Sequence, residues 1–260
     1  MSNVCECGKS ELGLFDPRPV QTSMERGAYV DIHPLTSPSG GGPIEFFIPS
    51  TSDEYIDLND TMFYVRGKVK KEDKTDLPDT ALIALSNIPL ASLFSDVSVV
   101  INDRQVEGGN HLYPYKTYMS YLLRFNKEAV DTHVRGTGFY KDEYGKMEDT
   151  EQRGFKARKL LIAKSNTFEF CGPITLDIFQ QSRYLLPNTD MRLKFLRHKS
   201  DFALISHDKP MQGGNPAIPA IKGIIDIEQS VLYVRRVKVS PSVLRGHLTG
   251  LDNYNAVYPI

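Results

Sequence analysis

Several features that would point to a familiar class of protein are missing from this sequence. The chain has 260 residues, no tryptophan, three cysteines and no run of about 18 apolar residues, so we expect no membrane-spanning helix. Cysteines at positions 5, 7 and 171 are too few for a disulfide framework, which predicts a reducing compartment, the cytoplasm or the nucleus. The first residues also lack the basic segment followed by an apolar stretch that marks a secretory signal.

An excess of positive charge is missing as well. The 31 basic and 32 acidic side chains give a formal net charge of −1, so we expect no specific binding to nucleic acid. A small basic run consists of Arg153, Lys156, Arg158 and Lys159. We interpret this run as a solvated face.

The sequence contains no recognisable catalytic motif. We find no Gly-x-Ser-x-Gly elbow, phosphate-binding loop, dinucleotide fingerprint or His-Glu-x-x-His. The carboxylate pairs, Asp142 with Glu143 and Glu148 with Asp149, lie in a polar segment and are expected to be solvated. The six histidines are scattered along the chain, at positions 33, 111, 133, 198, 207 and 247. We predict that the chain is not an enzyme, and we assign it no catalytic, cofactor-binding or metal-binding residues.

Two patterns resemble metal sites without meeting their requirements. Cys5 and Cys7 are separated by one residue, which is too close for a zinc knuckle. Four acidic residues crowd one short segment and offer oxygen ligands to calcium: Asp53, Glu54, Asp57 and Asp60. Their spacing fits no known calcium loop, so we favour a polar turn at Asn59 and Asp60.

Alternating apolar and polar residues dominate the rest of the chain, and this pattern is typical of β-strands. The 13 tyrosines and 13 phenylalanines supply large apolar side chains for a sheet core. Asn102 and Asp103 tolerate positive φ and predict a hairpin between residues 97–101 and 104–107. The other segments expected to be strands are residues 44–48, 61–69, 159–163, 167–171, 174–179, 191–196, 202–206 and 224–239. Cys171 lies in one of them and is expected to be a small buried apolar group.

Two segments show helical spacing instead. Pro114 begins the first, where Tyr115, Tyr118, Met119 and Leu122 form an apolar stripe that we assign to the core and not to a ligand site. Ser240 and Pro241 begin the second, and its predicted inward face is formed by Leu244, His247, Leu248 and Leu251. We interpret His247 as a core histidine.

These patterns predict an all-β fold: a jelly-roll β-sandwich of about eight main strands with two short inserted helices. Residues 1–42 are rich in Pro, Ser and Gly and are expected to be an extended or disordered arm. The sandwich is expected over residues 43–239, and a helix and the start of a linker over residues 240–260. The loops at residues 127–157 and 208–220 are long enough to suggest contacts with a neighbour.

Several longer blocks resemble capsid proteins of Polinton (Maverick) elements and adintovirus-like viruses. The blocks are Ile44-Glu-Phe-Phe-Ile-Pro, Tyr55-Ile-Asp-Leu-Asn-Asp-Thr-Met-Phe-Tyr-Val-Arg, Ser92-Leu-Phe-Ser-Asp-Val-Ser-Val-Val-Ile-Asn, Tyr113-Pro-Tyr-Lys-Thr-Tyr-Met-Ser-Tyr-Leu-Leu, Asp177-Ile-Phe-Gln-Gln-Ser-Arg-Tyr-Leu-Leu-Pro, Arg192-Leu-Lys-Phe-Leu-Arg and Tyr233-Val-Arg-Arg-Val-Lys-Val-Ser-Pro-Ser-Val. The resemblance implies a major capsid protein of two jelly rolls that forms homotrimers. In the virion, these homotrimers would contact neighbouring capsid proteins. This chain would supply the N-terminal jelly roll, so we expect a fragment, a truncated or genome-integrated copy, or a single-jelly-roll relative.

Two kinds of alternative stay open from the sequence. One is a single-jelly-roll vertex protein, a penton or minor capsid subunit. The other is a jelly roll that binds a ligand: a carbohydrate-binding module that uses the aromatic side chains, or a metal-dependent enzyme of the cupin type. The last would need clustered histidines, and the close His-x-His spacing of such sites is absent.

Overall fold

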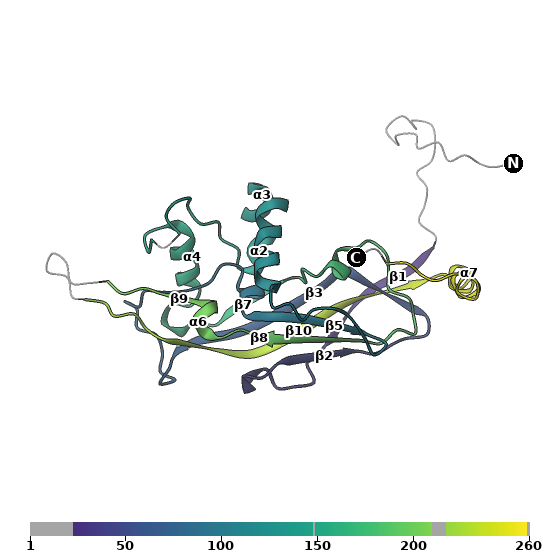
Figure 1. Ribbon diagram of the computed structural model, residues 1–260, viewed down its shortest axis with the longest axis horizontal. Helices are drawn as coiled ribbons and strands as arrows, with labels where there is room; N and C mark the ends of the chain where they lie inside the picture. Colours follow the sequence, from purple (N-terminus) through teal and green to yellow (C-terminus); the bar gives the residue numbers. More distant parts are fainter. Residues whose placement is uncertain (1–22, 148, 210–216, 259–260) are drawn as a thin grey trace, which may run out of the picture.

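The computed structural model is an elongated β-sandwich with helices on one side (Figure 1). It describes residues 23–147, 149–209 and 217–258. Two four-stranded antiparallel sheets make up the sandwich, in the orders β1-β10-β3-β7 and β2-β8-β5-β6. The strands of the first sheet are β1 (Met24–Ile32), β10 (Gly223–Val239), β3 (Glu54–Lys71) and β7 (Phe168–Pro173). Those of the second are β2 (Ile44–Ile48), β8 (Met191–Arg197), β5 (Phe94–Ile101) and β6 (Arg104–Glu107).

These eight strands confirm the predicted jelly-roll sandwich. A further small sheet pairs β4 (Ile83–Leu85) with β9 (Leu204–Ser206). Both predicted helices are present, as α2 (Tyr113–Arg124) and α7 (Pro241–Leu251). The described residues contain five more α-helices: α1 (Pro89–Ser92), α3 (Lys127–Asp131), α4 (Arg153–Leu161), α5 (Asp177–Gln180) and α6 (Ser200–Ala203). Short 3-10 turns lie at Pro38–Gly40, His133–Thr137 and Ala163–Ser165.

Phenylalanines fill the space between the two sheets. Phe63 on β3 stacks on Phe195 of β8 with ring centroids 4.2 Å apart. Phe46 of β2 and Phe94 of β5 meet the same two rings edge-on. All four side chains are fully buried, and burial alternates along β3 between residues 61 and 69, as the sequence pattern predicts. Aromatic contacts of this kind add to the free energy gained by burying the ring surface.

The predicted hairpin is confirmed in detail. Asn102 and Asp103 adopt φ of 45° and 63° between β5 and β6. Two successive positive φ values match the twist of the flanking strands, which explains why these two residue types stand there.

Four predicted segments have a different structure. Residues 159–163 continue α4 and enter a 3-10 turn, because a short apolar run fits a helix as well as a strand. Residues 174–179 end in α5, and residues 202–203 belong to α6. Finally, Asn59 and Asp60 lie within β3 and not in a separate loop, at a break in its register with β10: Met62 pairs with Tyr233, but Asp57 already pairs with Arg235.

The predicted arm is also wrong in its second half. Residues 24–32 form β1, which pairs with β10 at the edge of the first sheet. Seven of its nine side chains are exposed, and this explains why no alternation is visible in the sequence. Residues 1–22 of the predicted arm, with Cys5 and Cys7, and residues 210–216 of the predicted loop lie outside the described residues. No helix of the described residues is long and apolar enough to cross a membrane.

Candidate functional site

The helices α2, α3 and α4 stand on the same side of the sandwich (Figure 1), and α2 carries an apolar face that the other described residues leave largely exposed. Met119 is 55% exposed and Leu123 is 81% exposed, and Tyr115 and Leu122 are exposed beside them. We call Tyr115, Met119, Leu122 and Leu123 the α2 apolar face. The prediction that the stripe belongs to the core is therefore wrong for Tyr115, Met119 and Leu122, whereas Tyr118 packs against the core as predicted.

The reason is the rotation of α2 about its axis. Tyr113, Thr117 and Tyr121, spaced four residues apart, are the side chains that face the sandwich. The Thr117 hydroxyl donates a hydrogen bond to the Tyr113 carbonyl oxygen at 2.9 Å, which satisfies that buried polar group. Burial raises the pKa of the Tyr113 phenol above its ordinary value. The sequence offers two apolar stripes on this helix, and the one with a buried threonine is the inner one.

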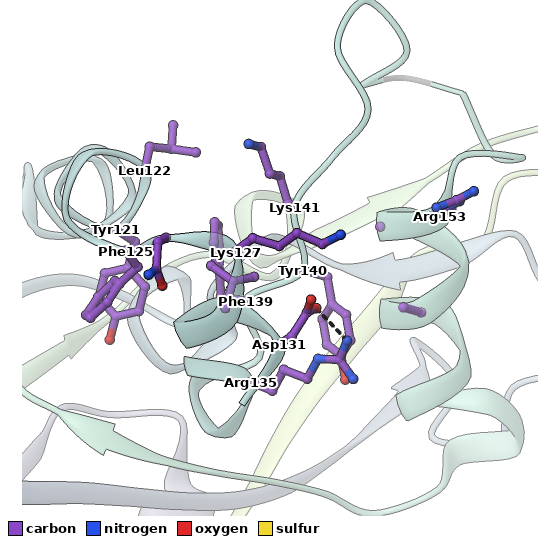
Figure 2. Close-up of a pocket in the computed structure, with 14 residues that line it drawn as sticks. Tyr121, Leu122, Phe125, Lys127, Asp131, Arg135, Phe139, Tyr140, Lys141 and Arg153 are labelled. Atoms are coloured by element: carbon purple, nitrogen blue, oxygen red, sulfur yellow. Dashed lines mark hydrogen bonds and ion pairs between the residues drawn. The ribbon is translucent and has the colours of Figure 1, made fainter. Parts of the chain in front are cut away.

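A pocket of about 540 Å³ lies between α2, α3 and α4 (Figure 2). Aromatic rings line much of it, and charged side chains reach over it from the rim. The lining residues are Tyr121, Leu122, Phe125, Asn126, Lys127, Val130, Asp131, Arg135, Phe139, Tyr140, Lys141, Arg153, Gly154 and Ala157. Leu122 belongs to both the pocket and the α2 apolar face, so the two surfaces are continuous.

The rim of the pocket is basic. Arg135 pairs with Asp131 at 2.9 Å and lies 6.0 Å from the centroid of the Tyr140 ring. Lys127 and Lys141 are exposed and form no ion pair with any described residue. Arg153 reaches Glu143 only at 3.8 Å and is 95% exposed. Four cations therefore surround an aromatic cavity that holds one carboxylate.

Beside the pocket, Arg158 of α4 is 1% exposed and holds the neighbouring loop. Its Nε donates to the Leu85 carbonyl oxygen at 2.9 Å, and its Nη1 donates to the Tyr140 carbonyl oxygen at 3.1 Å. The same Nη1 lies 2.9 Å from Asp142 Oδ1, which accepts no hydrogen bond of good geometry, so this contact is chiefly between charges. The interpretation of Arg158 and Asp142 as solvated is wrong: Arg158 is buried, the Asp142 side chain is only 11% exposed, and the two are paired. Arg153 and Lys156, in contrast, are exposed as predicted.

The four acidic residues of the calcium hypothesis pair with basic residues. Arg235 contacts Asp57 at 3.8 Å and also contacts Asp60, both from β3. Burial raises the pKa of Asp57, as does the nearby Asp60 carboxylate, while Arg235 and a hydrogen bond from the Asp60 N–H oppose the rise. Glu54 meets Arg26 and Arg236, and Asp53 meets Lys238. The described residues hold no group of three or more His, Cys, Asp or Glu suited to a metal ion.

His247 on α7 is exposed and is not the core residue that the spacing indicated. Its Nδ1 lies 2.7 Å from the Tyr55 hydroxyl, so it ties α7 to the end of β3. The helix packs through Val243 and Leu244, while Leu248 and Leu251 stay exposed. Cys171 lies on β7 as predicted but is only half-buried.

Sequence reasoning missed the pocket because α3 and α4 fall in the segment read as a loop. One cue was present: the Asn126 side chain accepts a hydrogen bond from the Ala129 N–H at 2.9 Å and caps α3. An asparagine before Lys-Glu-Ala-Val-Asp is a typical start of a helix. No pattern in the sequence indicates that Arg158 is buried.

The two packed sheets define a jelly-roll fold of the kind found in viral capsid proteins. A chain from the Sputnik virophage structure superposes with a TM-score of 0.58 and 14% identity, over 92% of this chain and 53% of that one. PBCV-1 VP54, fitted into a Sputnik reconstruction, gives 0.50 and 14% identity, over 89% and 46%. These likenesses establish the fold.

Comparison of sequences finds a distant relative. A Caenorhabditis elegans protein described as uncharacterised is 22% identical over 200 residues, which are 74% of this chain and 46% of that protein. No family model matches the chain. The chain spans about half the length of each of these three proteins.

Proposed function

We propose that this protein is a structural capsid subunit that associates with copies of itself. The observation that carries the proposal is the fold, because the match to the Sputnik chain extends over 92% of this sequence. The α2 apolar face supports it, since exposed apolar side chains grouped on one helix are typical of protein–protein contacts. The ion pairs described above join strands of the first sheet and hold the loop beside α4.

The finer assignment follows from the resemblance of the sequence to capsid proteins of Polinton elements and adintovirus-like viruses. We propose that the chain corresponds to the first of two jelly rolls of a major capsid protein, and that it forms homotrimers within a virion. The share of about half of each matched structure supports the single jelly roll. Capsid proteins themselves carry no enzymatic task, in keeping with a subunit that acts by shape and contact.

The proposal is tested on the full chain over a wide range of concentration. The two methods are light scattering after size-exclusion chromatography and electron microscopy. We expect discrete oligomers, and a trimer supports the major capsid role whereas a pentamer supports the vertex role. A strictly monomeric, folded protein at high concentration would overturn the proposal.

A pair of matched variants locates the contact. Met119→Glu places a charge on the α2 apolar face and is expected to reduce assembly strongly. Leu35→Glu places the same charge at an exposed leucine elsewhere, between β1 and β2, and is expected to assemble like the wild type. Equal behaviour of the two variants would argue against the α2 apolar face.

A further inference from the structure

One loop beside the pocket displays an aromatic ring in solvent. Tyr144 is 99% exposed, the highest value among the large apolar side chains of the described residues, and Met147 is exposed next to it. Solvent gives an aromatic ring little of the free energy that burial would provide. A ring held in this position is therefore available to a partner.

The loop that carries Tyr144 is fixed at both ends. The Gln152 side chain, which is buried, accepts a hydrogen bond from the Glu143 N–H at 3.2 Å and donates one to the Met147 carbonyl oxygen at 3.1 Å. Gly145 sits at the turn with a φ of 73°, which a side chain would strain. The Arg158 contact with Asp142 holds the preceding residue. Residues 143–147 are thus arranged before any partner binds, and this lowers the entropy lost on binding.

The pocket between α2, α3 and α4 has the complementary properties. It offers the partly exposed rings of Phe125 and Tyr140 as walls, and Lys127 and Lys141 extend over the space (Figure 2). Glu143, next to Tyr144, reaches its own partners Lys146 and Arg153 only at 3.6 Å and 3.8 Å. An aromatic ring flanked by a loosely paired carboxylate matches an aromatic cavity with unpaired lysines at its rim.

We infer that Tyr144 of one copy inserts into the pocket between α2, α3 and α4 of a second copy, with Glu143 meeting Lys127 or Lys141. The inference rests on the proposed self-assembly, which supplies the second copy. The contact is heterologous, because loop and pocket are different surfaces, and heterologous contacts form rings such as trimers when the rotation between copies closes. Leu122 makes the pocket continuous with the α2 apolar face, so both surfaces are covered together.

Tyr144→Ala in the full chain tests the contact, with Tyr254→Ala as the matched control because Tyr254 is 78% exposed elsewhere. We expect Tyr144→Ala to raise the dissociation constant of the oligomer by about tenfold or more, the usual effect of losing an aromatic anchor. Its melting temperature as a monomer should equal that of the wild type. The Tyr254 variant should assemble normally.

A crosslink identifies the occupant of the pocket. The photoreactive residue p-benzoylphenylalanine replaces Tyr144, and heavy-isotope and ordinary copies are mixed before illumination. We expect crosslinked peptides that join the two isotopes and contain residues 121–141. Assembly that persists unchanged in Tyr144→Ala, or crosslinks confined to one isotope or to other surfaces, overturns this contact alone. A wild type that never assembles overturns the proposed function and this contact together.

Discussion

Replacing Arg158 by methionine should cost this fold a large part of its stability. Arg158 is 1% exposed, and the variant leaves the Asp142 carboxylate, itself 11% exposed, without its positive partner. Removing one member of a buried ion pair costs about 3–5 kcal/mol. The Leu85 carbonyl oxygen also loses the Arg158 Nε donor, whereas the Tyr140 carbonyl oxygen keeps the Asn87 side chain at 2.7 Å. The methionine stem recovers some packing, so we expect a net loss of about 3–4 kcal/mol.

Asp142→Asn and the double variant complete a thermodynamic cycle. Asp142→Asn keeps an oxygen that can accept from Asn87, which lies 3.2 Å from Oδ2, and should cost about 2–3 kcal/mol. The double variant leaves no buried charge, so its loss should fall about 2 kcal/mol short of the sum of the single losses. Urea unfolding at neutral pH measures all three free energies from midpoint and slope.

Arg153→Met serves as the control, because Arg153 is a neighbour on α4 that is 95% exposed. Its loss should be within about 0.5 kcal/mol. A cost below about 1 kcal/mol for Arg158→Met, or single losses that simply add, would refute the argument that this pair is buried and mutually dependent.

Three further results are expected. Gly154→Ala should lower the free energy of unfolding by about 2 kcal/mol, because the added Cβ would collide with Asp142 Oδ1. This loss is expected although alanine favours helices over glycine by about 1 kcal/mol. Urea titrations measure the change, and a stabilised variant would contradict the prediction. Burial lowers the pKa of His198 below 6.5, so its contribution to stability is complete above that pH and disappears as the pH falls through the lowered pKa. His198→Gln should therefore lose less stability than the wild type between pH 7.5 and pH 5, and equal losses would contradict the assignment. Burial raises the pKa of the Cys171 thiol, which leaves less of the reactive thiolate. In a Cys5→Ser, Cys7→Ser variant, alkylation of Cys171 at pH 7.4 should be about tenfold slower in the folded protein than in urea. Equal rates would show that Cys171 is an accessible thiolate in the fold.

The sequence predicts the sandwich well where one face of a strand is buried. Alternation over residues 61–69 predicted the strand β3, and Asn102 with Asp103 located the hairpin, because both signals are local. The same reasoning fails for β1, whose side chains are exposed on both faces and whose structure depends on pairing with β10. Pairing between residues some two hundred positions apart leaves no local pattern.

The interaction surface was harder to predict than the fold. On α2, the sequence offers a larger apolar stripe and a mixed one, and the mixed stripe is buried because Tyr113 and Thr117 fit the sandwich and share a hydrogen bond. Arg158 looks like any member of a basic run, and its burial depends on carbonyl oxygens supplied by residues 85 and 140. In both cases, contacts with segments distant in the sequence determine which side chains are buried.

The position of β10 between β1 and β3 has a consequence for hydrogen exchange. In an antiparallel sheet, successive amides of a central strand bond alternately to the neighbour on either side. From Leu232 to Val239, β10 lies between β1 and β3. The β1 strand is held mainly by backbone hydrogen bonds because it buries few side chains, whereas β3 is well buried. Its amides therefore fall into two interleaved groups, and those bonded to β1 exchange sooner than those bonded to β3. The exchange rates of amides within this one strand thus distinguish two opening events, the release of β1 from the sheet edge and the unfolding of the whole sandwich.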